Sequence, residues 1–335
     1  MIESPEWYIE KIEKVCVITE GLNSGKPIKL LPWQKKVIRD MPDKLSIWVE
    51  IARKNGKSAL LAAISIVHLL EGWKHNTNPQ VIIAAATREQ AGILFGYVRN
   101  MILLNPILSK YLVANKYKIE LKGKPGFLKT IAADGGAAHG LNPSLVLCDE
   151  IHAWSETKGP PLYEALFTAG GVRMAPVITI TTAGSQSTFA HEKHIYAANV
   201  KKKQIKDPYM GVHIYAANEG DNWEEIKTWK KANPSLGATL KKEYLKANHI
   251  KAMNDPVAAI SFKKLHLNLW SGSANPFIAL ENWDPLQSKR PEDLKEWNCF
   301  LGIDLANVSD FNAFSLLWYN DGQYYSENHY LITRK

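Results

Sequence analysis

Hydrophobic and polar positions alternate in blocks along residues 1–184. Short apolar runs rich in β-branched residues are bounded by polar or glycine positions, which is typical of buried strands. Between them, apolar side chains recur every three to four positions, as in amphipathic helices. Strands are expected at Leu45–Ile51, Val81–Ala86, Leu128–Ala133, Leu145–Cys148 and Val177–Thr181, and helices at Lys57–Glu71, Arg88–Leu104 and Pro161–Ala169. This alternation predicts the α/β class, with a parallel sheet covered by helices.

The pattern changes after residue 184. One further strand is expected at Met210–Ala217, followed by helical periodicity. The expected helices cover Trp223–Lys231, Lys241–Met253 and Pro256–Leu269. Proline, serine and asparagine collect in Ser271–Pro291, which favours a linker. A separate unit rich in strands is expected after it, at Cys299–Ala306, Ala313–Tyr319 and Gln323–Ile332.

A polar loop, Ala52–Ser58, joins the first expected strand to the helix that follows it. Such a loop presents backbone N–H groups to phosphate and can hold a nucleoside triphosphate. Lys57 would face the β- and γ-phosphates, Ser58 would offer its hydroxyl to Mg²⁺, and Gly56 would let the backbone approach closely. The match to G-x-x-x-x-G-K-[ST] is incomplete, because Ile51 replaces the first glycine. From this loop alone, a plain turn with a helix cap stays open.

Two acids, Asp149 and Glu150, directly follow the apolar strand Leu145–Cys148. In P-loop ATPases the first acid holds the Mg²⁺ shell, and the second can polarise the attacking water. For the pair alone, a solvated strand end that caps the next helix is the alternative. Ligands of parallel sheets bind at the carboxyl ends of the strands, where the loop, the acids and the turn Thr181–Gly184 all lie. The motifs therefore predict a single nucleotide site.

The length of the chain predicts about two domains. The chain has 335 residues and a mass of 37.6 kDa, and domains usually contain about 100–200 residues. A net charge of +8 favours a polyanionic partner such as nucleic acid, although a basic soluble surface has the same charge. Cys16, Cys148 and Cys299 form no C-x-x-C pair, which argues against a disulfide framework or a zinc site. Without a leader or a spanning apolar segment, we expect a soluble protein of a reducing cytoplasm.

A set of motifs along the chain resembles a known family. In order, they are Leu31–Gln34, Ala52–Ser58, Ala86–Ala91, Asp149–His152, Thr181–Gly184 and Asn233–Gly237. They resemble the large terminase subunit of tailed bacteriophages, essentially from end to end. The resemblance implies a RecA-like P-loop ATPase of the ASCE type with a lid subdomain, followed by the start of an RNase H-like nuclease domain. Residues 1–184 would form the ATPase core, 185–270 the lid, 271–298 the linker and 299–335 the N-terminal part of the nuclease domain.

The resemblance also implies roles for single residues of the nucleotide site. Gln34 would read adenine, Asp149 would hold Mg²⁺ together with Ser58, and Glu150 would be the catalytic base. Further nucleotide contacts would come from Arg53, Lys54, Asn55, Gly56, Lys57 and Ser58. Arg53 corresponds to the basic residue typical of the terminase loop and would also be catalytic, so the departure at Ile51 is expected within this family.

A coupling motif is implied as well, in which Thr181, Thr182 and Gly184 link ATP hydrolysis to movement on DNA. For Gln34 and for Thr181–Gly184, a purely structural role remains open. Gln34 would then only cap a helix, and Thr181–Gly184 would only end a strand in a glycine turn.

Asp304 is the candidate metal ligand of the nuclease domain, where the resemblance implies Mg²⁺ or Mn²⁺. Two-metal cleavage needs several carboxylates around metals about 4 Å apart. The family takes the others from later strands, and this chain stops at Lys335. Asp310 and Glu327 do not have the family's positions, so we expect no competent nuclease.

The expected function is that of an ATP-hydrolysing motor subunit that translocates duplex DNA into a procapsid. The resemblance implies double-stranded DNA, the portal protein and the small terminase subunit as partners, a homo-oligomeric ring on the portal, and no membrane. The setting would be the host bacterial cytoplasm. Arg88, Arg99 and Arg173 are candidates for an arginine finger that acts on a neighbouring subunit.

Two other classes of function stay open. A DExH-type helicase matches Asp149–His152 and Gln34, but it needs a second RecA-like domain, which nothing after Thr182 offers. A nucleotide-gated binding protein without hydrolysis would more often lack one acid of the pair. His191–His194 lacks the H-E-x-x-H spacing of a metal site, so exposed polar helix residues are the better account. Core or interface packing, rather than base stacking, is expected for Trp223, Trp229, Trp270, Trp283 and Trp297.

Overall fold

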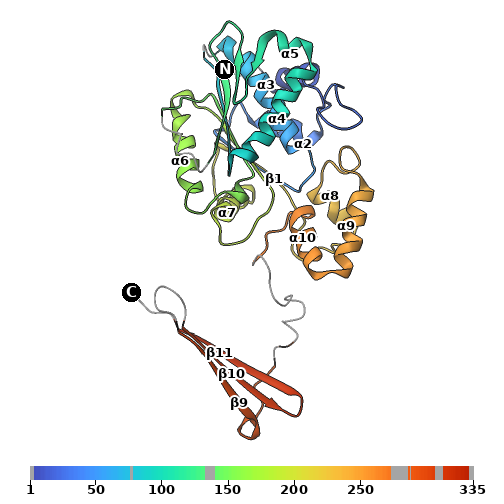
Figure 1. Ribbon diagram of the computed structural model, residues 1–335, viewed down its shortest axis with the longest axis vertical. Helices are drawn as coiled ribbons and strands as arrows, with labels where there is room; N and C mark the ends of the chain where they lie inside the picture. The colour runs from blue at the N-terminus through green and yellow to red at the C-terminus, as the bar shows by residue number, and fades with distance from the viewer. Residues whose placement is uncertain are drawn as a thin grey trace. The chain divides into compact units, whose positions relative to one another are not determined.

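A computed structural model describes residues 4–75, 78–132, 140–272, 286, 288–305 and 312–331. The chain divides into two compact units, Met1–Asn275 and Pro276–Lys335. In the larger unit, a sheet carries helices on both faces, and a further group of helices lies beside it (Figure 1). Across the described part of the chain, no helix has both the length and the apolar character needed to cross a bilayer.

The larger unit is built on a sheet with the strand order β3-β4-β5-β2-β6-β7-β1-β8. From β5 to β8 in this order all neighbours are parallel, and β3 and β4 add an antiparallel edge. The strands are β1 (Ser46–Ile51), β2 (Gln80–Ala85), β3 (Leu112–Ala114), β4 (Lys118–Leu121), β5 (Phe127–Ala132), β6 (Leu145–Asp149), β7 (Val177–Thr181) and β8 (Met210–Tyr215). The predicted α/β class with a mostly parallel sheet is confirmed, whereas the short edge strands β3 and β4 were not expected.

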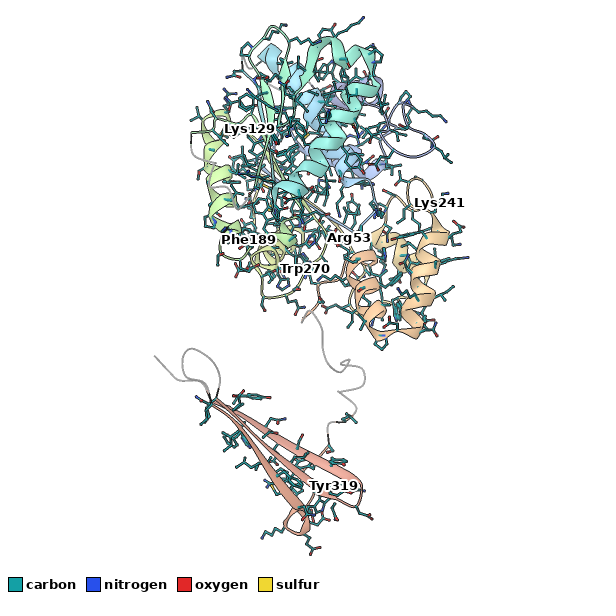
Figure 2. The ribbon with its side chains drawn as sticks, viewed as in Figure 1. Arg53, Lys129, Phe189, Lys241, Trp270 and Tyr319 are labelled. Atoms are coloured by element: carbon teal, nitrogen blue, oxygen red, sulfur yellow. The ribbon has the colours of Figure 1, made fainter. Side chains whose placement is uncertain are left out.

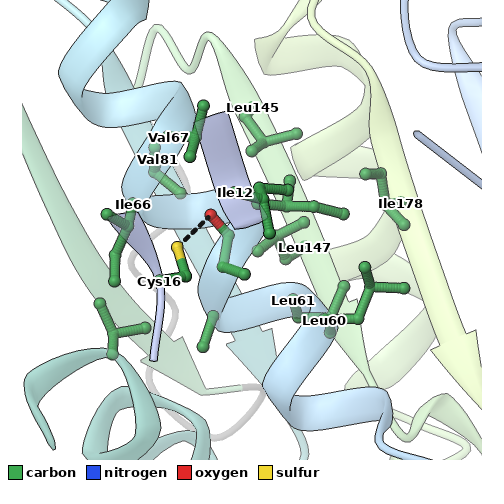
Figure 3. Close-up of a cluster of buried hydrophobic side chains, with 14 of the residues drawn as sticks. Ile12, Cys16, Leu60, Leu61, Ile66, Val67, Val81, Leu145, Leu147 and Ile178 are labelled. Atoms are coloured by element: carbon green, nitrogen blue, oxygen red, sulfur yellow. Dashed lines mark hydrogen bonds between the residues drawn. The ribbon is translucent and has the colours of Figure 1, made fainter. Parts of the chain in front are cut away.

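Helices cover both faces of this sheet. They are α1 (Pro5–Val15), α2 (Pro32–Asp40), α3 (Lys57–His75), α4 (Arg88–Leu104), α5 (Pro106–Tyr111), α6 (Gly159–Ala169) and α7 (Phe189–Lys201). Alternate strand residues enter different cores: Ile47 and Val49 pack with α1 to α5, and Trp48 packs with α6 and α7. Figure 3 shows the first core, where Ile12 of α1 and Leu60 of α3 lie over the sheet. Apolar strands and amphipathic helices thus fold into three layers.

Helices α8 (Ile226–Ala232), α9 (Lys242–Asn254) and α10 (Pro256–His266) form the separate group, with a small core of their own. Trp229 and Phe262 are almost fully buried in it. Strand β8 does not belong to this group, although it falls in the range 185–270 expected to form a lid. It pairs with β1 along its whole length, because its apolar side chains pack on the main sheet.

The smaller unit contains the strands β9 (Asn298–Asp304), β10 (Asn312–Asn320) and β11 (Gln323–Leu331). They form an antiparallel sheet in the order β11-β10-β9, which agrees with the strands expected in this region. All residues of β9 are exposed. Trp318 of β10 is largely buried.

Candidate nucleotide-binding site

The loop between β1 and α3 turns sharply at two residues. Lys54 and Gly56 have φ angles of 66° and 87°, in the left-handed region that glycine adopts without strain. Helix α3 begins directly afterwards, at Lys57. Its free N–H groups and its dipole favour an anion at this end. The loop therefore has the backbone geometry of a phosphate-binding turn.

Lys57 lies at the centre of the site and is buried. Its Nζ donates to the carbonyl oxygen of Ile51 at 3.1 Å and to Oγ1 of Thr182. It also forms an ion pair with Oε1 of Glu150 at 3.1 Å. An ammonium group has three protons to donate, so these contacts use all of them. Residues at or directly after the carboxyl ends of β1, β6 and β7 thus all contact this lysine.

Glu150 follows β6 with a φ of 48°. Its Oε2 accepts from the N–H of Thr182 at 3.1 Å and lies 3.1 Å from Nδ1 of His152. Burial by itself would raise the pKa of this carboxyl, but Lys57 and His152 lower it to about 2. The carboxylate is therefore ionised at neutral pH and held in one orientation.

Asp149, the last residue of β6, is buried. Burial and the neighbouring charge of Glu150 raise its pKa to about 7, against a lowering effect of Lys57. Ser58 lies in the first turn of α3. A carboxylate and a hydroxyl are oxygen ligands of the kind that Mg²⁺ takes. Among the described residues, no three His, Cys, Asp or Glu side chains cluster as a metal site.

Asn55 ties the loop to the turn Asn233–Gly237. Its Nδ2 donates to Asn233 Oδ1 at 2.9 Å and to the Ala52 carbonyl at 3.1 Å. Its Oδ1 accepts from the N–H of Ser235 at 3.1 Å, and its carbonyl oxygen accepts from Ser235 Oγ at 2.9 Å. Both ends of the side-chain amide are thus hydrogen-bonded inside the protein. The expected contact of Asn55 with a nucleotide would therefore be made by its backbone.

Three more residues were expected to contact the nucleotide: Gln34 beside the loop, and Arg53 and Lys54 within it. Gln34 is buried, and its Oε1 accepts from the N–H of Leu31 at 2.8 Å, as the capping alternative requires. Its Nε2 lies 3.6 Å from the point that a Cβ on Gly56 would occupy, so it also borders the loop. Arg53 and Lys54 have exposed side chains. Arg53, labelled in Figure 2, donates its backbone N–H to Leu265 of α10 at 3.0 Å.

The residues expected to couple hydrolysis to movement begin at the end of β7. Thr181 Oγ1 accepts from the N–H of His152 at 3.3 Å, and Thr182 contacts Lys57 as described. At Gly184, an added Cβ would lie 2.9 Å from Cβ of His152 and 3.2 Å from the Trp270 ring. A side chain does not fit there, so glycine is required by the close approach of its neighbours.

Asp304 is the last residue of β9 and belongs to the smaller unit. It lies opposite Ala313 of β10, whereas Glu327 of β11 lies opposite Leu316. Positions three residues apart on a strand face opposite sides of the sheet, so Glu327 does not share a face with Asp304. Asp310 lies outside the described residues. The described part of this unit also lacks the parallel sheet that a second RecA-like domain of a helicase would need.

Several polar residues of the site were not expected from the sequence. His152 contacts the carboxylate of Glu150, and Ser235 donates a hydrogen bond to the carbonyl oxygen of Asn55.

The side chains of His191–His194 were expected to be exposed. This is wrong for His194, because its Nδ1 lies 2.6 Å from the buried carboxylate of Glu50. The only sequence signal for Glu50 is an acid inside an apolar strand.

Two family models match the chain. One, for the ATPase domain of the terminase large subunit, matches residues 31–199, and one for its endonuclease domain matches residues 204–335. The second match begins ahead of β8, which belongs to the larger unit. Its boundary therefore does not coincide with the structural division at residue 275.

Individual relatives agree with these matches. The chain is 30% identical over 317 residues to the large terminase subunit of Enterobacteria phage HK97, covering 92% of this chain and 61% of that protein. It is 29% identical over 183 residues to Protein YmfN of Escherichia coli (strain K12), covering 53% of this chain and 40% of that protein. The crystal structure of the HK97 large terminase aligns with a TM-score of 0.70 at 26% identity, over 98% of this chain and 68% of that one. The chain thus spans less than two thirds of the length of these curated relatives.

Proposed function

Because the chain belongs to the terminase large subunit family, we propose that it is the ATP-hydrolysing motor subunit that moves duplex DNA into a viral procapsid. The observation that carries the proposal is the meeting of Lys57, Glu150 and Thr182 beside the N-terminus of α3. A phosphoryl-transfer motor uses a lysine of the phosphate loop and an acid at a strand end, and here a threonine directly after a third strand joins them.

ATP and Mg²⁺ fit the chemistry of this site. The left-handed residues Lys54 and Gly56 shape the loop, and the N-terminus of α3 faces the same point. Ser58 and Asp149 would hold Mg²⁺, which neutralises phosphate charge when it is bound. Lys57 would face the β- and γ-phosphates. Since its three protons are engaged by Ile51, Thr182 and Glu150, it must release at least one of these partners, and we propose that it releases Glu150 and Thr182.

Glu150 is the proposed general base. While Lys57 is paired with Oε1, that oxygen is not free to take a proton from water. Release of Lys57 frees Oε1, and the N–H of Thr182 keeps Oε2 in place. Binding of the phosphates by Lys57 would therefore prepare the base for hydrolysis. Arg53, Gln34 and the backbone of Asn55 are proposed to contact the nucleotide around this centre.

The domain roles are part of the proposal. We assign the lid to α8, α9 and α10, since β8 belongs to the main sheet. Residues 271–298 would be the linker, and residues 299–335 would begin an RNase H-like nuclease domain. Asp304 would hold nuclease metal only together with further acids, so we propose that this chain does not cut DNA.

Double-stranded DNA, the portal protein, the small terminase subunit and a homo-oligomeric ring are the proposed partners, in the host bacterial cytoplasm. The basic net charge of +8 suits contact with a phosphate backbone. Arg88 and Arg99 border one cavity of about 720 Å³ beside α4. Arg173 instead donates to the Asn78 carbonyl at 2.7 Å, so Arg88 and Arg99 are the better candidates for a finger in trans.

The test is an ATPase titration of residues 1–335 with and without duplex DNA, joined to a plasmid-cutting assay in Mn²⁺. The proposal expects Mg²⁺-dependent ATP turnover and uncut plasmid. A protein that binds ATP but never hydrolyses it, with or without DNA, would contradict the motor role. Strand separation of duplex DNA would favour the helicase alternative.

A further inference from the structure

Residues 267–271, which follow α10, lie along the turn that follows β7. Ser271 donates its N–H to the Gly184 carbonyl at 3.2 Å, and Gln186 donates to the Ser271 carbonyl at 2.8 Å. Ser185 and Ser271 form a parallel β-bridge. This segment, 267–271, is thus joined through the backbone to the end of the expected coupling motif.

Asn268 links the segment to Ala183, which follows Thr182. It is 1% exposed and has a φ of 59°. Its Oδ1 accepts from the N–H of Ala183 at 2.7 Å, and its Nδ2 donates to the Tyr215 carbonyl at 2.8 Å. Both ends of the amide are therefore used, and one side chain joins the turn after β7 to the end of β8.

Trp270, labelled in Figure 2, fastens the segment to β1. Its Nε1 donates to Oε1 of Glu50 at 3.1 Å, and Glu50 is fully buried. The other oxygen of Glu50 accepts from Trp48 Nε1 at 3.1 Å and lies 2.6 Å from Nδ1 of His194. These partners hold the buried carboxylate in place, because moving it away from all of them would leave its charge without hydrogen bonds.

We propose that Asn268 and Trp270 are positioning residues through which a structural change at the nucleotide site is transmitted to segment 267–271. This rests on the proposed function. When Lys57 turns from Thr182 toward phosphate, the change at Thr182 reaches Ala183 and, through its N–H, Asn268. Trp270 keeps its hydrogen bond to Glu50 of β1, whereas Asn268 follows Ala183. Segment 267–271 is therefore expected to rotate about Trp270. The chain continues from it into the smaller unit.

The experiment is amide hydrogen exchange of residues 1–335 with ADP and with a non-hydrolysable ATP analogue, followed by mass spectrometry. In the unmodified chain, exchange in peptides covering 182–187 and 267–272 is expected to differ between the two nucleotides. Asn268→Gly removes the amide and accepts the left-handed φ without strain. It should abolish the difference at 267–272, keep it at 182–187, and leave kcat and KM for ATP within about twofold, since no ligand contact is lost.

Trp270→Phe keeps the ring but removes the hydrogen bond to Glu50, and it should enlarge exchange at 267–272 with both nucleotides. Trp48→Phe is its matched control, because it removes a hydrogen bond to the same carboxylate without touching the segment, and it should keep the wild-type response. The inference is overturned if the unmodified chain shows no nucleotide response at 267–272, or if Asn268→Gly and Trp270→Phe both retain it unchanged. Nucleotide-dependent exchange without any ATP turnover would instead overturn the motor function and leave the inference standing.

Discussion

Lys57 Nζ and Glu150 Oε1 lie 3.1 Å apart, so the loop lysine and the acid after β6 form an ion pair inside the site that both would serve. Lys57 is 7% exposed. Removing one member of a buried pair leaves the other charge without its partner. Substitutions at these two residues are therefore expected to be non-additive.

Lys57→Ala should weaken ATP binding and reduce turnover together. The variant loses the charge that faces the β- and γ-phosphates, and losing one such donor typically costs roughly 10²-fold or more in rate. Binding of a fluorescent ATP analogue and release of phosphate measure the two effects. The double variant Lys57→Ala/Glu150→Gln is the control for stability, since it leaves no unpaired carboxylate. Near-normal turnover in Lys57→Ala would refute the site.

Glu150→Gln should bind ATP and Mg²⁺ almost normally but turn over ATP roughly 10²- to 10⁴-fold more slowly, because an amide cannot accept the proton of the attacking water. Asp149→Asn should first raise the Mg²⁺ concentration needed for half-maximal turnover, since it removes a charged oxygen ligand. Mg²⁺ titrations of both variants separate these roles. Identical Mg²⁺ responses and nucleotide affinities would show that the division between Asp149 and Glu150 is wrong.

Residues 1–335 should leave plasmid DNA uncut in Mg²⁺ and in Mn²⁺, even where ATP is hydrolysed. Asp304 alone is too few ligands for two metals, and Glu327 lies on the other face of the sheet. Agarose gels of supercoiled plasmid provide the measurement, with Asp304→Ala as the control. Metal-dependent nicking that persists through purification and disappears in Asp304→Ala would mean that another acid completes the site.

Ser235→Ala should destabilise the larger unit by roughly 1–3 kcal/mol, the usual cost of a buried polar group without a partner. The change removes the hydroxyl that donates to Asn55 and accepts from Trp33 Nε1 at 2.9 Å. Urea unfolding measures the loss, and Ser24→Ala, at an exposed serine, is the matched control. Equal stability of the two variants would contradict a structural role for this link between the loop and the turn Asn233–Gly237.

His68 should make the protein less stable as the pH falls below about 6.5. Burial lowers its pKa in the folded protein to about 4, so between these values the unfolded chain binds the additional proton. Stability from the neutral ring is complete above pH 6.5 and is lost as the pH falls toward 4, by roughly 3 kcal/mol in total. Urea unfolding at pH 7 and pH 4.5 should show a smaller decrease in His68→Gln. The same decrease in both proteins would exclude this assignment.

The strands and the loop of the nucleotide site could be predicted because their signals are local. An apolar run followed by Gly56, Lys57 and Ser58, or by Asp149 and Glu150, is readable without knowing the fold. Strands β3 and β4 were missed because they contain only three and four residues, too few for a periodic pattern to be recognised. Asn268 and Glu50 were missed for another reason: each contacts partners far away in the chain. The acid inside an apolar strand marks Glu50 as unusual but does not reveal those partners.

The sheet of the smaller unit has a practical consequence for handling the protein. Among the described strands, β9 lies at the edge of its sheet, and its side chains Phe300, Leu301 and Ile303 are 58%, 58% and 62% exposed. Unpaired backbone groups next to apolar side chains are a template for strands of other molecules. Concentrated samples of this chain should therefore associate through β9 during storage, and Leu301→Lys should slow this association.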